Sequence, residues 1–212
     1  MFVIFCSTGG NFVVFYEGTT AAGIPLNDEK FGMLYGKHIN IVMRNKKTEQ
    51  HYLKSSFREK LIEHLFVGEL LKLSWSDGSC SLEIAKPEVD NQGYDLIAEE
   101  DGIIRHIQLK AAHLEAKASK QKVHIALSAK PSGCVVWVYF NEKTLELGPF
   151  LFFGGSAGLP LPSLEGFRVA KHTKANAEGI KAERPEIREI PKGKFIRYET
   201  VGQIYEQLFK SA

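Results

Sequence analysis

The sequence has few cysteines: three among 212 residues, at Cys6, Cys80 and Cys134. Their number is odd, they lie far apart, and no two of them form a Cys-x-x-Cys pair. This spacing argues against a structural zinc site and against a disulfide-rich secreted domain. A few unpaired cysteines are typical of proteins of the reducing cytoplasm, where we expect this chain to act.

Long apolar runs, internal repeats and a large net charge are also absent. No apolar stretch reaches the roughly 20 residues that a helix needs to cross a bilayer, so we expect no membrane partner. No self-similarity at a fixed period points to a repeat fold. The formal net charge is +2, with 44% hydrophobic and 25% charged residues. These values are ordinary for a globular domain with a sizeable core.

We expect residues 1–50 to form an N-terminal extension, whose structure the sequence does not define. The start, MFVIFCSTGGNFVVFYEG, has no basic segment before its apolar residues, which argues against a signal peptide. A β-hairpin that turns at Gly9-Gly10 fits this pattern better. Translation that begins at Met33 or Met43 stays open as an alternative, because a regular pattern of helix and strands starts only after residue 50.

Residues 51–153 carry the pattern of an α/β core. Apolar periodicity predicts a helix over 57–73, with Ser56 as its N-cap and Glu59 completing a capping box. The run CVVWVYF is apolar on both faces and predicts a central strand at 134–140. The other expected strands are 79–85, 94–99, 103–110, 123–128 and 145–153. Both tryptophans, Trp75 and Trp137, are expected in the core.

Residues 154–212 are expected to form a basic loop segment and a C-terminal helix, 199–210, that packs back on the core. Between Arg168 and Arg197 nine Lys or Arg residues stand against four Glu. Such an excess can hold a polyanion through its phosphates, although a solvated surface with uneven charge is the alternative. The residues proposed to bind nucleic acid are Lys171, Lys174, Lys181 and Arg184.

An Asp-Gly pair between alternating apolar residues is a strong hairpin signal, and it stands at Asp101-Gly102. Counting back from a two-residue turn there places Asp95 directly opposite Gln108, with about 5 Å between their Cβ atoms. Lys110 lies two residues further and therefore on the same face. The pattern predicts a carboxylate, a carboxamide and an ammonium group on one patch.

These three groups suit a hard divalent cation and a phosphate. Asp95 supplies a charged oxygen ligand for Mg²⁺, and Gln108 can add a neutral amide oxygen. Lys110 can orient the attacking water and stabilise charge on the phosphate. On the predicted helix, Glu63 stands in line with an apolar stripe, so its carboxylate needs a partner if it is buried. A metal ion would serve, and a hydrated position at the edge of the stripe is the alternative.

The succession Glu63-His-Leu-Phe-Val, Gly93-Tyr-Asp95-Leu and Ile107-Gln108-Leu-Lys110 resembles the PD-(D/E)xK nuclease superfamily. The resemblance covers about 57–140. It implies a restriction-endonuclease-like fold, a mixed sheet with a central β-hairpin flanked by helices. It also implies a Mg²⁺-dependent endonuclease, with Mn²⁺ as a substitute, in which the catalytic residues are Glu63, Asp95, Gln108 and Lys110 and the metal ligands are Glu63, Asp95 and Gln108.

The sequence departs from the family pattern at two points. Gln108 stands where Glu or Asp is common, which weakens the expected metal affinity. No proline directly precedes Asp95, and Asp90 in the preceding loop is a reserve ligand. Three alternatives stay open: a non-catalytic nucleic-acid-binding module on the same fold, an unrelated α/β protein, and a surface salt bridge between Asp95 and Lys110. Cutting both strands of a duplex with one active site per chain would suggest a homodimer.

Overall fold

The computed structural model describes residues 4–8, 11–15, 55–89, 91–175, 177 and 179–210. The chain divides into two units, Met1–Ser55 and Ser56–Ala212. The first unit contains an antiparallel hairpin of β1 (Ile4–Thr8) and β2 (Asn11–Phe15), with residues 9 and 10 between the strands. The expected N-terminal hairpin is therefore confirmed. The candidate start positions Met33 and Met43 lie outside the described residues.

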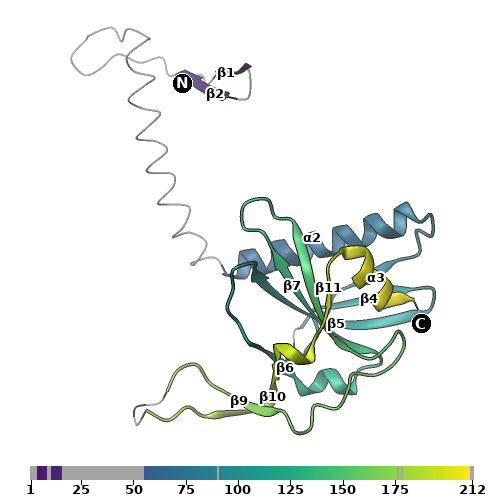
Figure 1. The fold of residues 1–212 in the computed structure, drawn as a ribbon, viewed down its shortest axis with the longest axis vertical. Coiled ribbons are helices and arrows are strands. Elements are labelled where there is room, and N and C mark those ends of the chain that lie inside the picture. Colours follow the sequence, from purple (N-terminus) through teal and green to yellow (C-terminus); the bar gives the residue numbers. More distant parts are fainter. Residues whose placement is uncertain are drawn as a thin grey trace. The chain divides into compact units, whose positions relative to one another are not determined.

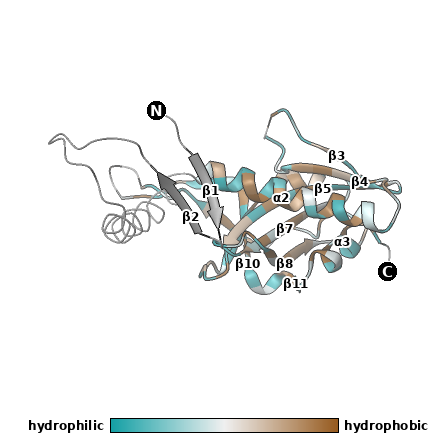
Figure 2. Cartoon of the chain, turned by 90° about the horizontal axis from the view of Figure 1, so that it is seen from above, coloured by the Kyte–Doolittle hydropathy of each residue, from teal (hydrophilic) through white to brown (hydrophobic). Residues whose placement is uncertain are grey.

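A six-stranded mixed sheet forms the centre of the second unit (Figure 1). Each neighbouring pair of strands is antiparallel except β5 and β7, which run parallel. The expected mixed α/β sheet with an internal hairpin is confirmed, and hydrophobic residues gather on its central strands (Figure 2). In spatial order the strands are β11 (Ile196–Tyr198), β8 (Leu147–Gly154), β7 (Gly133–Phe140), β5 (Ile103–His113), β4 (Leu96–Glu100) and β3 (Glu83–Ala85).

One face of this sheet is covered by the helices α2 (Ser55–Ser76) and α3 (Val201–Phe209). Both expected helices are present, but α2 is longer than predicted at both ends, and Ser56 lies inside it rather than at its N-cap. α3 begins with a capping box formed by Thr200 and Gln203. Trp75, expected in the core, is instead 77% exposed near the end of α2.

The opposite face is covered by a small antiparallel sheet of β6 (Lys120–His124), β10 (Glu183–Pro191) and β9 (Arg168–Lys171). Two 3₁₀ helices belong to this layer, η1 (Ile125–Ala129) and η2 (Lys192–Lys194). A second core of buried residues, Trp137 and Ile190 among them, lies between the two sheets. The sequence predicted a loop for most of this region, and the prediction was wrong because β9 and β10 carry charges and prolines rather than alternating apolar residues.

A buried arginine joins the hairpin to the C-terminal helix. Arg105 on β5 is fully buried and donates hydrogen bonds to the carbonyl oxygens of Gln207 and Leu208, at 3.0 and 2.7 Å, and to that of Gly155 at 3.3 Å. A cation at a helix C-terminus satisfies carbonyl groups that lack helical partners. α3 is thereby fixed to the strand that carries Gln108 and Lys110. Among the described residues, none of the helices has both the length and the apolar character needed to cross a bilayer.

Candidate active site

The hairpin of β4 and β5 has the predicted register. Glu100 pairs with Ile103 and Leu96 pairs with Ile107, so Asp101 and Gly102 form a two-residue turn. Both turn residues have positive φ, 50° for Asp101 and 80° for Gly102, as a type I′ turn requires. The turn chemistry that the sequence encodes thus sets the position of every residue along both strands.

Asp95 lies one residue before β4, at the point where the antiparallel pairing ends. Its backbone N–H donates to the carbonyl oxygen of Ile107 at 2.8 Å. Its carboxylate oxygen Oδ2 accepts a hydrogen bond from the backbone N–H of Leu109 at 2.7 Å. β5 continues to His113, beyond the last residue that pairs with β4. Beside this unpaired part of β5, the Asp95 carboxylate accepts the hydrogen bond that a carbonyl group of a neighbouring strand would otherwise accept. The regular pairing ends at Leu96 and Ile107, so the predicted pairing of Asp95 with Gln108 stays a prediction.

Gln108 and Lys110 share the face of β5 that lies away from α2. Their neighbours Ile107 and Leu109 pack into the core beneath the helices, and side chains alternate along a strand. On the parallel strand β7 the residues beside Gln108 and Lys110 are Val135 and Trp137. Gln108 is 8% exposed, and in the described part of the chain its carbonyl oxygen Oε1 is buried without a hydrogen-bond partner. Lys110 is half-buried.

Glu63 lies on the core side of α2 and is 6% exposed. Its carboxylate is held by two lysines, with Oε2 2.8 Å from Lys60 Nζ and Oε1 2.5 Å from Lys86 Nζ. Burial raises the pKa of Glu63, but the hydrogen bonds and charges of these two lysines outweigh burial and bring that pKa below its ordinary value. The hydrated alternative is therefore excluded, because the buried carboxylate has cationic partners.

Lys86 connects Glu63 to the end of the sheet where Asp95 lies. It follows Ala85, which pairs with Ile97 on β4, so Lys86 lies at the level of Leu96, the residue after Asp95. The ion pair therefore brings Glu63 to the same end of the hairpin as Asp95. Glu63 lies on the α2 side of the sheet, however, and Gln108 and Lys110 lie on the opposite face. A shared cavity for the two carboxylates remains a prediction. Sequence reasoning missed Lys86 because nothing in its local pattern distinguishes it from a solvated surface lysine.

Few acidic groups gather at this end of the hairpin. Within the described ranges, no group of three or more His, Cys, Asp or Glu side chains is arranged to hold a metal ion. A cation here would depend on Asp95 and Glu63 for negative charge and on Gln108 for a neutral oxygen. The reserve ligand Asp90 lies outside the described residues.

No protein-family model matches the sequence, and no curated protein matches it. Among solved structures, the chain is similar to a bacterial homing endonuclease, I-Ssp6803I, at 16% identity and a TM-score of 0.31. The match covers 60% of this chain and 86% of that chain. At this identity and TM-score the similarity does not establish a shared activity.

The four residues predicted to bind nucleic acid lie on the hairpin of β9 and β10. Lys171 ends β9, Arg184 lies on β10, Lys174 and Lys181 lie between the strands, and all four are exposed. On β6 next to them, Lys120 forms an ion pair with Glu189, with Nζ and Oε2 2.6 Å apart. Lys171 and Arg184 thus lie on ordered strands, whereas Lys174 and Lys181 lie in the connection between them, as the sequence suggested.

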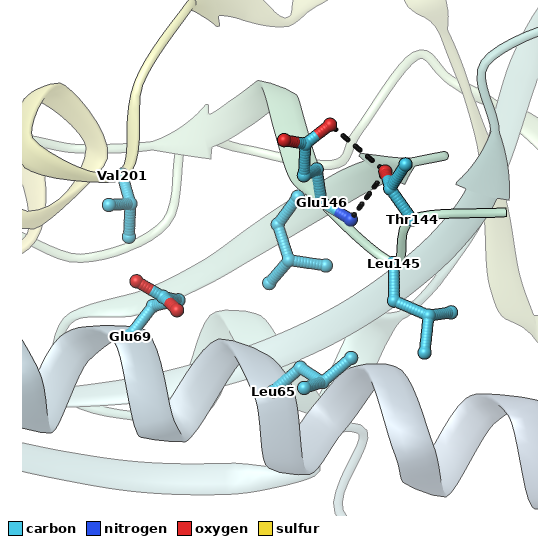
Figure 3. A pocket seen from close by; sticks show the side chains of 7 residues that line it. Leu65, Glu69, Thr144, Leu145, Glu146 and Val201 are labelled. Atoms are coloured by element: carbon cyan, nitrogen blue, oxygen red, sulfur yellow. Dashed lines mark hydrogen bonds between the residues drawn. The ribbon is translucent and has the colours of Figure 1, made fainter. Parts of the chain in front are cut away.

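A cavity of about 360 Å³ opens between α2, the turn before β8 and the start of α3 (Figure 3). Glu69 and Glu146 lie on its walls, and Thr144 Oγ1 donates to Glu146 Oε2 at 2.9 Å. Lys72 holds the Glu69 carboxylate at 2.9 Å. None of the four predicted catalytic residues lines this cavity. The hairpin site and the cavity are therefore separate features.

Proposed function

We propose that this chain is a metal-dependent endonuclease that hydrolyses phosphodiester bonds in DNA. The observation that supports the proposal is the hydrogen bond from the backbone N–H of Leu109 to the Asp95 carboxylate, because Leu109 lies between Gln108 and Lys110 on β5. The order of these residue types along the chain resembles the PD-(D/E)xK nuclease pattern. The buried, unpartnered oxygen of Gln108 supports a ligand role, because a buried polar atom is costly unless something binds it.

The donor set fits a hard divalent cation such as Mg²⁺ or Mn²⁺. Asp95 would contribute its carboxylate, which can accept several bonds at once and so can serve both Leu109 and a cation. Gln108 would add its amide oxygen. Glu63, on the α2 side of the sheet, would add a second carboxylate only where its ion pairs with Lys60 and Lys86 open. When bound, such a cation polarises the phosphoryl group and lowers the pKa of water.

Lys110 would supply a positive charge next to the phosphate. Its ammonium group lies two residues beyond Gln108 on the same face, where it would orient the attacking water and neutralise charge that develops on the phosphate. The exposed basic residues of the β9–β10 hairpin would bind the phosphate backbone without reading its sequence.

A second candidate is a nucleic-acid-binding module without catalysis. It is favoured by the neutral Gln108 and by the absence, in the described part of the chain, of a group of three acids, cysteines or histidines. Plasmid, linear duplex and single-stranded DNA incubated with Mg²⁺, Mn²⁺ or EDTA would separate the two candidates. We expect cleavage with either cation and none in EDTA or with the Asp95→Asn variant. DNA binding without cleavage in every condition would reject the nuclease and support the binding module.

A further inference from the structure

α2 has a second apolar face, on the side opposite the core. Its core face contains Phe66 and Leu70, both fully buried. On the other side, Phe57 is 69% exposed, Leu71 44% and Trp75 77%. Spacings of four and three residues alternate along this face, as in a heptad repeat. We call this face the α2 stripe, and it consists of Phe57, Leu61, His64, Gly68, Leu71 and Trp75.

The middle of the α2 stripe is open to close approach. A Cβ atom added to Gly68 would meet no atom within 4 Å. Leu61 and Leu71 both lie on the opposite side of the helix from Phe66. A helix that is apolar on both sides is normally buried on both sides. An exposed apolar surface of this length points to a protein partner.

We propose that the α2 stripe is the contact surface for a second copy of this chain, with the two α2 helices antiparallel about a two-fold axis. A two-fold contact requires that the surface complement itself. The α2 stripe complements itself when the axis passes between the two helices at the level of residue 66 along each of them. Phe57 then meets the partner's Trp75, Leu61 meets the partner's Leu71, and His64 meets the partner's Gly68. Each of the six positions has a partner within the stripe, and the smallest residue faces the imidazole.

The two exposed aromatic side chains supply about half of the area that a dimer needs. At the exposures of Phe57 and Trp75, these two side chains offer roughly 300 Å² per chain, since an aromatic side chain buries about 150–250 Å². Two copies would therefore bury about 600 Å² through aromatic residues alone, and the rest of a 22-residue helix adds to it. Specific interfaces begin at about 1,200 Å² in total. The inference does not depend on nuclease activity.

The test is the oligomeric state of the full chain, measured by sedimentation over a series of protein concentrations. We expect a dimer for the wild type and a monomer for the Phe57→Lys/Trp75→Lys variant. Both side chains are exposed, so circular dichroism should show an unchanged fold. The matched control is Leu114→Lys/Leu159→Lys, which adds the same charge at two exposed leucines outside the α2 stripe and should remain dimeric. A monomeric wild type, or a dimer that survives Phe57→Lys/Trp75→Lys, would overturn the proposal.

Cross-linking tests the antiparallel arrangement separately. The Phe57→Cys/Trp75→Cys variant should form a disulfide-linked dimer on oxidation, whereas Phe57→Cys alone should not, because its two copies lie about 27 Å apart along the helices. The wild type measures the background from the native cysteines. Linkage through Phe57→Cys alone would indicate parallel helices and reject the proposed axis. A monomer whose Trp75 fluorescence is protected from a soluble quencher would show that residues 1–54 cover the stripe, which also rejects the proposal.

Discussion

The carboxylate of Asp95 accepts a hydrogen bond from the backbone N–H of Leu109, with Oδ2 2.7 Å from the nitrogen. Leu109 lies between Gln108 and Lys110, so this bond fixes Asp95 to the very segment that carries the other two candidate groups. The bond also gives Asp95 a structural role, because it satisfies a strand N–H where the pairing with β4 ends. Substitutions at Asp95 must therefore separate the effect on folding from the effect on chemistry.

Two substitutions at Asp95 make that separation. Asp95→Asn keeps an oxygen that can accept from Leu109 but removes the negative charge, so we expect unchanged stability. Cleavage should fall by more than about 10²-fold, which exceeds the usual loss for a residue that only supports a metal ligand. Asp95→Ala should also lower the free energy of unfolding by about 1–2 kcal/mol, because the N–H of Leu109 loses its partner. Urea unfolding and DNA cleavage measure the two effects. An Asn variant as active as the wild type would remove Asp95 from the metal site.

Lys110→Ala tests the proposed orienting lysine. We expect cleavage to fall by about 10²–10⁴-fold, the usual scale for a positioned catalytic group, while DNA binding changes little. Lys143→Ala, at an exposed position in the turn before β8, is the control and should leave cleavage unchanged. Equal cleavage rates for Lys110→Ala and the wild type would show that Lys110 takes no part in the reaction.

The hairpin could be predicted from sequence because its geometry is local. Asp101-Gly102 selects one turn type, and a period of two then fixes which residues share a face. The partners of Glu63 could not be predicted, because Lys86 reaches it only through the pairing of β3 with β4. β9 and β10 were missed for a related reason: the pairing of β10 with β6 is non-local, and Pro185 and Pro191 interrupt the expected pattern of β10.

The ion pairs of Glu63 predict a pH dependence of stability. Its pKa is lowered on folding from an ordinary value of 4.5, so its contribution to stability is present above that value and is lost as the pH falls through the lowered pKa. The wild type should therefore exceed Glu63→Gln in free energy of unfolding at neutral pH, and the difference should shrink in acid. Urea titrations at several pH values measure it. Glu69→Gln, which alters an exposed pair with Lys72, should show little difference at any pH. A Glu63→Gln difference that grows in acid would contradict this account.

The basic residues of the β9–β10 hairpin predict a salt dependence of DNA binding. Reversing charge at Lys171, Lys174 and Lys181 together should weaken binding. It should also reduce the slope of log affinity against log salt concentration by up to about three, because about 0.9 counterions are released for each phosphate contact. Fluorescence anisotropy of labelled duplex DNA over a salt series measures the slope. Reversal at Lys72, Lys143 and Lys210, which are exposed and lie outside this hairpin, is the control. Identical slopes for the variant and the wild type would make the hairpin a solvated surface.

The last prediction concerns Gln108, whose buried carbonyl oxygen has no hydrogen-bond partner among the described residues. As a ligand it would bring no charge, so the site would hold one negative charge fewer than its acidic counterpart and bind Mg²⁺ more weakly. Gln108→Glu should keep the shape of the side chain and tighten metal binding, so cleavage should persist with a Mg²⁺ requirement at lower concentration. Gln108→Ala removes the oxygen and should sharply reduce cleavage.

Cleavage rate against Mg²⁺ concentration for the wild type and both Gln108 variants decides between the two candidate functions. A nuclease gives an active wild type, a curve shifted to lower Mg²⁺ for Gln108→Glu, and a depressed curve for Gln108→Ala. A binding module gives an inert wild type, and activity gained only in Gln108→Glu would identify the neutral side chain as the cause of that inertness. Coinciding curves for the wild type and Gln108→Ala would show that Gln108 is not a ligand. Its buried oxygen would then need another partner, such as an ordered water.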